Sequence, residues 1–328
     1  MNWKKASNGL SENNDKKPLI ILSGPTAAGK TDLSISLAKT IGGEIISADS
    51  MQVYKGFYIG TAKISREEMQ DVPHYLIDIL EADEEFNVYE FQKRTLSALE
   101  TIYRNGNIPI IVGGTGFYIQ SILYDIAFTE EETDKTYRRS LEVLAEKEGP
   151  ESVHKLLEEA DPEAAAQIHA NNIKRTIRAL EFFRETGQKI SEHNEEQRQK
   201  ISPYNFAYFV LNRDRQILYE RIDLRVDQMM EEGLLEEVRT LLESGVSPNS
   251  LAMQGLGYKE IVDYLQERCS LEEAVYNIKI GTRHFAKRQL TWFRREKDVL
   301  WLNYEDFEND KAAMLAYMMK ILSEKRII

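Results

Sequence analysis

The chain has 328 residues and a formal net charge of −12, with 42% hydrophobic and 29% charged residues. Such a composition belongs to a globular protein, and the length indicates two domains or one domain with an insertion. The lone Cys269 excludes an internal disulfide and a cysteine-built zinc site. No apolar run approaches the ~20 residues of a membrane span, and the chain start lacks the apolar core of a secretory signal. We therefore expect a cytoplasmic protein without membrane contact.

Residues 1–17 are polar and without periodicity, and we expect them to form a disordered tail. The apolar run Pro18–Leu22 then predicts a buried strand, and residues 32–40 predict a helix. Between them stands a perfect match to G-x-x-x-x-G-K-[ST], made by Gly24, Pro25, Thr26, Ala27, Ala28, Gly29, Lys30 and Thr31.

This strand, loop and helix predict a phosphate-binding loop. Backbone N–H groups converge in such a loop, and the start of the helix adds its positive dipole end. Lys30 would supply a charge to the outer phosphates, and the Thr31 hydroxyl would bind the Mg²⁺ that accompanies them. Because the loop recognises charge and spacing, its ligand need not be ATP and can be the diphosphate of another molecule.

A second strand is predicted at residues 43–48, and it delivers Asp49 at its carboxyl end. In a doubly wound sheet this end faces the ligand crevice, so Asp49 is expected near the phosphates. Its carboxylate could bind Mg²⁺ or accept a proton from a nucleophile. The alternative is an aspartate that only caps a turn.

Alternating strands and helices continue along the chain. Residues 55–73 predict loop and short helix, and residues 75–80 predict a third strand. An amphipathic helix at residues 88–104 and a buried fourth strand at residues 109–112 follow. This order predicts an α/β fold, a parallel sheet flanked by helices like that of P-loop NTPases.

The fourth strand runs into the glycine-rich segment 113–116, where many P-loop NTPases carry an aspartate. Thr115 could donate its hydroxyl to ligand or metal there, although a simple glycine-rich turn explains the segment equally well. Asp78, in the predicted third strand, is a weaker candidate for a metal-side carboxylate.

From Thr129 to residue 199 the chain is charged, has three helical periodicities and contains no strand pattern. We expect an all-helical insertion domain between the two parts of a core domain, residues 18–128 and 200–328. The insertion concentrates basic residues, although each alone could belong to a solvated face. They are Arg138, Arg139, Lys174, Arg175, Arg178 and Arg184.

A fifth strand is predicted at residues 206–211, followed by a helical stretch at residues 215–244. In this stretch Arg221 and Arg225 could bind a phosphate or form surface ion pairs. The last predicted helix, residues 271–295, carries six Lys or Arg and no acidic residue from Lys279 onward. Together with Phe285, Trp292 and Phe293 these charges suit a single-stranded nucleic acid, unless the aromatic rings belong to the core.

Six segments, in this order and at this spacing, resemble the bacterial tRNA dimethylallyltransferase family over residues 18–303. They read GPTAAGKT, DSMQVYKGFYIGTAK, IVGGTGFY, NNIKRTIRALE, MQGLGYKE and TRHFAKRQLTWFRR. Tyr58, where the family more often has aspartate, and Ala28, where it often has serine, are the departures.

The resemblance implies a Mg²⁺-dependent prenyl transfer from dimethylallyl diphosphate to N6 of the adenosine 3′-adjacent to the anticodon, in tRNAs reading codons that begin with U. It implies that the loop 24–31 binds the diphosphate and that Lys30, Thr115, Asp49 and Arg225 are catalytic. It also implies a surface for the tRNA anticodon stem-loop. That surface comprises Asp49, Ser50, Met51, Gln52, Thr115, Arg138, Lys174, Arg175, Thr176, Ile177, Arg178, Gln254, Gly255, Leu256, Gly257, Tyr258, Lys259, Arg283, Lys287 and Arg288.

Three other functions fit parts of the chain. A P-loop kinase of a small metabolite explains the first domain but not the basic tracts, and an adenylate isopentenyltransferase acting on free nucleotides has no need of those tracts. A nucleotide-gated RNA-binding module without chemistry is the third. The chain shows no extended a/d heptad seam, so we expect a monomer.

Overall fold

The computed structural model describes residues 16–128 and 135–328, which form two compact units. The first unit contains the chain up to Leu123 together with Pro203–Ile328, and the second contains Tyr124–Ser202. Most of the tail expected at residues 1–17 lies outside the described residues, and Lys17 already begins the first strand. The expected start of the insertion, Thr129, also lies outside them.

The first unit is built on a six-stranded sheet in the order β3-β2-β4-β1-β5-β6, and all of its pairings are parallel. The inner strands are buried on both faces, which explains their continuous apolar runs. This confirms the predicted α/β fold. The strands are β1 (Lys17–Ser23), β2 (Gly43–Ala48), β3 (His74–Tyr75), β4 (Ile108–Gly113), β5 (Tyr204–Asn212) and β6 (Val299–Asn303).

The two edges of the sheet differ from expectation. β3 covers only two residues, so the predicted strand at residues 75–80 is wrong beyond Tyr75. Leu76 and Asp78 have positive φ angles of 64° and 54°, which turn the chain out of the extended conformation. Leu80 keeps only an isolated parallel bridge to Tyr54. At the other edge, the sequence pattern did not predict β6.

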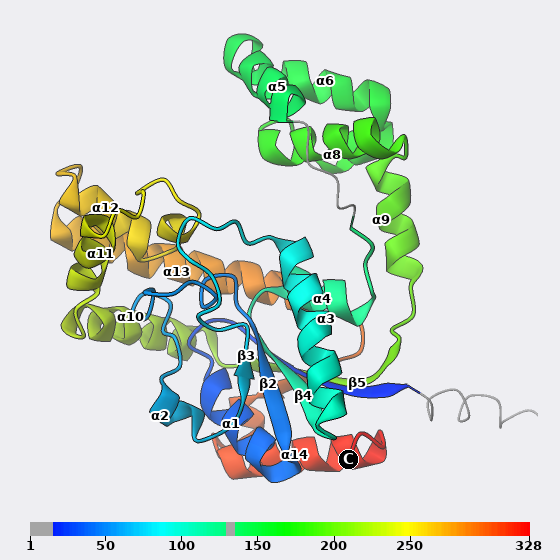
Figure 1. The fold of residues 1–328 in the computed structure, drawn as a ribbon, viewed down its shortest axis with the longest axis vertical. Helices are drawn as coiled ribbons and strands as arrows, with labels where there is room; N and C mark the ends of the chain where they lie inside the picture. The colour runs from blue at the N-terminus through cyan, green and yellow to red at the C-terminus, as the bar shows by residue number, and fades with distance from the viewer. Residues whose placement is uncertain (1–15, 129–134) are drawn as a thin grey trace, which may run out of the picture. The chain divides into compact units, whose positions relative to one another are not determined.

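Helices cover both faces of the sheet (Figure 1). α1 and α14 pack on one face, where Leu33, Leu37, Met314 and Met318 share a core with β1, β4 and β5. α3 contacts β2, β4 and α4 and lies on the other face. The bounds are α1 (Lys30–Ile41), α2 (Arg66–Met69), α3 (Val88–Arg104), α4 (Gly116–Leu123), α10 (Arg215–Glu231), α11 (Leu234–Glu243), α12 (Tyr258–Leu265), α13 (Leu271–Phe293) and α14 (Lys311–Glu324), with single 3₁₀ turns at Ala252–Gln254 and Tyr304–Phe307.

The helical stretch predicted at residues 215–244 forms two helices, because Gly233 adopts a left-handed conformation between α10 and α11. α10 packs along α13. Two ion pairs join them: Arg283 donates to Asp223 through two guanidinium nitrogens, and Lys279 donates to Asp227 Oδ2 at 2.8 Å. A capping box of Ser270 and Glu273 begins α13.

The described residues of the second unit form helices joined by short loops and contain no strand. Leu141, Val153, Leu157, Ile177 and Leu180 centre its hydrophobic core. Its helices are α5 (Lys135–Glu148), α6 (Pro150–Ala160), α7 (Pro162–Gln167), α8 (Ile173–Thr186) and α9 (Ile190–Gln199). Across the described parts of both units, no helix has the length and apolarity to cross a bilayer.

Candidate active site and RNA-binding surface

Three loops meet at the carboxyl ends of β1, β2 and β4. The register aligns Gly113 of β4 with both Ser23 of β1 and Ala48 of β2. The Thr115 N–H donates to the Ala48 carbonyl at 3.3 Å, and the Ser23 hydroxyl donates to the Gly113 carbonyl at 2.7 Å. The phosphate loop, the Asp49 segment and the glycine-rich segment are therefore neighbours, at the edge where parallel α/β sheets bind ligands.

The phosphate loop has the backbone that its sequence predicts. Gly29 precedes α1 with a φ of 96°, and Ala27 also has a positive φ. The Lys30 ammonium lies back over the loop and donates to the carbonyls of Gly24 at 3.0 Å and Pro25 at 2.8 Å. Carbonyl oxygens thus hold the ammonium beside the loop, within reach of an arriving phosphate.

A cluster of charges surrounds this loop. Burial, with the nearby positive charge of Arg225, lowers the pKa of Lys30 to about 8, although Asp49 acts in the opposite direction. Burial also lowers the pKa of Arg225, and Asp49 again opposes the shift. Two partly desolvated cations thus lie within electrostatic range of one carboxylate, an arrangement that favours the binding of an anion.

Two further arginines reach the same loop. Arg221 Nε donates to the Ala27 carbonyl at 2.9 Å. Arg213 Nε lies 3.4 Å from the Ala28 carbonyl, and its guanidinium carbon lies 3.3 Å from the centroid of the Tyr304 ring. Sequence reasoning missed Arg213, whose one signal is its position directly after β5.

Asp49 both caps a turn and stands in the charge cluster. Its Oδ1 accepts the N–H groups of Met51 at 2.8 Å and Gln52 at 3.3 Å. The side chain of Gln52 is itself held by the Ser47 hydroxyl at 3.2 Å. The turn-capping and functional interpretations are therefore compatible, because the turn orients the carboxylate beside Lys30 and Arg225.

Gln289 of α13 joins two of the three loops, and sequence reasoning assigned it no role. Its Oε1 accepts the N–H of Thr26 at 2.9 Å, and its Nε2 donates to the Gly114 carbonyl at 3.0 Å. The side chain is buried. The signal that could have found it is a single uncharged amide within a run of basic residues.

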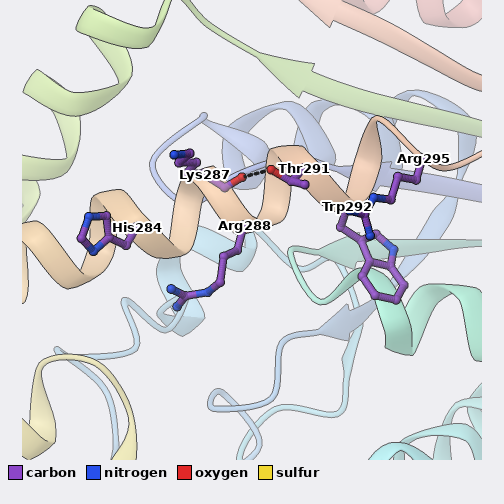
Figure 2. Close-up of a pocket in the computed structure, with 6 residues that line it drawn as sticks. All are labelled: His284, Lys287, Arg288, Thr291, Trp292 and Arg295. Carbon is purple, nitrogen blue, oxygen red and sulfur yellow. Dashed lines mark hydrogen bonds between the residues drawn. The ribbon is translucent and has the colours of Figure 1, made fainter. Parts of the chain in front are cut away.

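α13 also carries a basic hollow of about 400 Å³, and Figure 2 draws the residues that line it. Its lining residues come from this helix and, with Arg295, from the turn that follows it, at spacings of three and four residues that keep the side chains along one stripe. Arg288 and Trp292 project to the same side in Figure 2. The lining residues are His284, Lys287, Arg288, Thr291, Trp292 and Arg295.

Comparison with known proteins decides the family. The model of the family described as "IPP transferase" matches residues 52–296, well over half of the chain. The chain belongs to the IPP transferase family.

Relatives and solved structures agree with this membership. A protein named tRNA dimethylallyltransferase from Lachnoclostridium phytofermentans is 61% identical over 312 residues, covering 95% of this chain and 99% of its own. The crystal structure of a tRNA isopentenylpyrophosphate transferase from Bacillus halodurans is 42% identical, with a TM-score of 0.71, and covers 95% of this chain and 98% of its own. A eukaryotic dimethylallyltransferase acting on tRNA is 31% identical with a TM-score of 0.81, covering 94% of this chain and 80% of its own.

Within this IPP transferase fold, several segments proposed to contact RNA lie together in the first unit. Gly255 lies close against Met51: a Cβ added to Gly255 would be 2.5 Å from Met51 Cε. Gly281 of α13 likewise packs against Leu256, with a Cβ only 2.8 Å from Leu256 Cδ2. The segments 49–52 and 254–259 therefore adjoin each other and α13, and Gln254 and Lys259 are exposed on them.

Three of the residues predicted to contact RNA have buried side chains. Tyr258 is fully buried, with its ring centroid 4.8 Å from that of Phe57 and its hydroxyl donating to Glu237 at 2.7 Å. Thr176 and Ile177 are buried in the second unit, on the inner side of α8. The predicted motif covers both faces of α8. Its exposed side chains on this helix are Lys174, Arg175 and Arg178, which stay predicted RNA contacts.

Some other predicted residues have structural partners. Arg138 makes two hydrogen bonds, of 2.8 and 2.7 Å, to the buried carboxylate of Glu181. Asp78, the weaker candidate for a metal-side carboxylate, pairs with the buried ammonium of Lys63. Phe293 is fully buried and belongs to the core, which removes it from the aromatic residues available to nucleic acid.

Proposed function

We propose that this chain is a tRNA dimethylallyltransferase, which moves the dimethylallyl group of dimethylallyl diphosphate to N6 of the adenosine 3′-adjacent to the anticodon, in tRNAs reading codons that begin with U. The proposal rests on one observation. In an IPP transferase fold, the loop 24–31, the Asp49 carboxylate and Thr115 lie next to one another at one edge of the sheet. The free diphosphate is the second product.

The loop 24–31 binds the diphosphate of the donor. Its backbone N–H groups and the start of α1 face the anion, and Lys30 and Arg225 supply positive charge to it. As the allylic C–O bond breaks, the electron pair leaves with the diphosphate, and these fixed charges stabilise it. The loop thus binds a leaving group where kinases bind a nucleotide.

Asp49 is the proposed base. The lone pair of N6 attacks the allylic carbon, a C–N bond forms, and the proton of N6 passes to the Asp49 carboxylate. Thr115, next to Asp49 through its hydrogen bond to Ala48, orients the amine or holds the departing oxygen. Since an exocyclic amine is a weak nucleophile, alignment of the two substrates supplies much of the rate.

Mg²⁺ is proposed to arrive with the diphosphate. The described residues contain no group of three or more His, Cys, Asp or Glu side chains that could hold a metal. A single exposed hydroxyl, that of Thr31 at the start of α1, fits an ion held mainly by phosphate oxygens and water. The bound ion would supply charge neutralisation to the leaving diphosphate.

The anticodon stem-loop is the proposed partner, and the chain acts as a monomer. The segments 49–52 and 254–259 and the basic stripe of α13 form the surface in the first unit, and Lys174, Arg175 and Arg178 form a separate basic patch in the second. The target adenine must leave its stack, which costs least in a loop.

The test is incubation with labelled dimethylallyl diphosphate and unmodified tRNA. We expect label in the RNA, and none in a matched tRNA with guanosine in place of the target adenosine, because guanosine lacks the N6 amine. Label in free adenylate instead would indicate the nucleotide isopentenyltransferase, and phosphoryl transfer from ATP would indicate the kinase.

A further inference from the structure

We propose that Gln289 is a positioning residue that holds the phosphate loop and the Thr115 segment at a fixed separation. The inference rests on the proposed function, and it adds a residue outside the three reacting loops. Its consequence is that the donor affinity and the turnover both depend on one buried amide of α13.

The geometry of the amide supports this role. The two ends of the Gln289 side chain are used differently: Oε1 accepts from the Thr26 N–H and Nε2 donates to the Gly114 carbonyl. Thr26 belongs to the loop 24–31, which is proposed to bind the diphosphate, and Gly114 directly precedes Thr115. One rigid amide plane therefore bridges the group that binds the leaving diphosphate and the group that orients the nucleophile.

Gly114 is shaped to fit the amide. A Cβ at this position would lie 2.0 Å from Gln289 Nε2 and would displace it. Gly114 is not among the glycines with a positive φ, so an alanine there would clash with Gln289 without straining the backbone. The pair Gly114 and Gln289 thus acts as one unit.

The element that carries Gln289 strengthens the inference. Lys287, Arg288 and Thr291, which line the basic hollow and are drawn in Figure 2, lie within two positions of Gln289 on the same helix. α13 therefore contributes to the reacting loops through the buried Gln289 and to the proposed RNA surface through exposed side chains such as Lys287 and Arg288. Replacing Gln289 leaves these exposed charges in place.

Gln289→Leu removes both hydrogen bonds and keeps a similar volume. We expect the Kd of inorganic diphosphate with Mg²⁺ to rise about 10-fold and kcat to fall about 10- to 100-fold, because a small displacement of reacting groups is costly. The Kd of the anticodon stem-loop should change less than about twofold. Gly114→Ala should reproduce these losses, and the double variant should be no worse than either single variant, because both changes break the same contact.

Gln289→Glu separates positioning from mere packing. Its protonated carboxyl can accept from Thr26 and donate to Gly114, whereas the carboxylate cannot donate. We expect the kcat of Gln289→Glu, relative to wild type at each pH, to rise as the pH falls from about 8.5 to about 6. Near pH 6 the kcat of Gln289→Glu should exceed the kcat of Gln289→Leu. Equal kcat values would mean that protonation of the glutamate only removed a charge repulsion, and this would overturn the proposal.

Two results would contradict the inference. The first is a ratio of the kcat of Gln289→Glu to the kcat of wild type that does not change with pH. The second is unchanged diphosphate affinity and kcat in Gly114→Ala, or in Gln289→Leu if that variant folds. Prenyl transfer by the wild type is measured alongside. Its absence would count against the proposed function, whereas normal transfer by all variants would remove only the role of Gln289.

Discussion

At the scale of single residues, the charge of Lys30 is the quantity most open to measurement. Its pKa of about 8 in the free protein means that the ammonium persists below pH 8 and is lost as the pH rises through it. Diphosphate favours the ammonium and raises this pKa, so binding should take up a proton above pH 8.

Calorimetry of diphosphate binding, in buffers of different ionisation enthalpy, measures this proton uptake. We expect up to one proton between pH 8 and about 9.5. Lys30→Arg is the matched control, since guanidinium stays charged in this range and should abolish the uptake. The same uptake in both proteins would show that another group titrates.

Asp49 permits a comparison between two replacements. Asp49→Asn keeps an oxygen that accepts the Met51 and Gln52 N–H groups, whereas Asp49→Ala loses the turn as well. If Asp49 is the base, single-turnover rates fall at least ~100-fold in both, with RNA affinity nearly unchanged in Asp49→Asn. An active Asp49→Asn variant would show that Asp49 caps the turn and is not the base.

The sequence predicts the local part of this site and misses the distant part. The phosphate loop is a continuous segment whose function is carried largely by its own backbone, so eight consecutive residues suffice to predict it. Gln289 reaches that loop from 263 residues away, and Arg213 reaches it from 185. Such contacts depend on which side chains the folded sheet edge brings together, and no local pattern encodes them.

At the scale of elements, one carboxylate of α11 organises the segment that follows the second strand. Glu237 accepts the N–H groups of Tyr58, Ile59 and Gly60 at 3.0, 2.7 and 3.2 Å. Glu237→Ala leaves these donors without this partner, and we expect a loss of about 2 kcal/mol in unfolding free energy, measured by urea denaturation. Glu236→Ala, which removes an exposed pair with Arg239, should cost less than about 0.5 kcal/mol. Equal losses would contradict the assignment.

Basic residues of α13 allow the proposed RNA surface to be tested within one element. Lys287→Ala and Arg288→Ala should each weaken binding of the anticodon stem-loop and lower the slope of log K against log salt by about 1, with diphosphate affinity unchanged. Lys320→Ala in α14 removes the same charge from a different, well-exposed position and should alter neither quantity. A uniform effect of all three would mean that net charge, not this helix, governs binding.

Elements with strong local signals were predicted to within a few residues. Residues 88–104 show a helical period and an Asn87 cap, and α3 has the predicted bounds. The run at residues 75–80 has strand-like composition, yet positive φ angles at Leu76 and Asp78 and the ion pair of Asp78 with Lys63 turn it into a loop. Tertiary contacts override a weak local preference at a sheet edge.

At the scale of the whole molecule, an acidic protein is proposed to bind an acidic polymer. The net charge of −12 is an average, and the proposed RNA surface depends on local stripes such as that of α13. We propose that the protein combines that surface with a phosphate loop that binds a leaving group and not a nucleotide.

A structure of the protein with a non-hydrolysable dimethylallyl diphosphate analogue, Mg²⁺ and the anticodon stem-loop tests this claim most directly. We predict both phosphorus atoms in the loop 24–31 next to Lys30, and the target adenine with N6 within hydrogen-bonding distance of Asp49. A diphosphate bound away from Gly29 and Lys30, or an adenine stacked in its own RNA loop, would contradict the account.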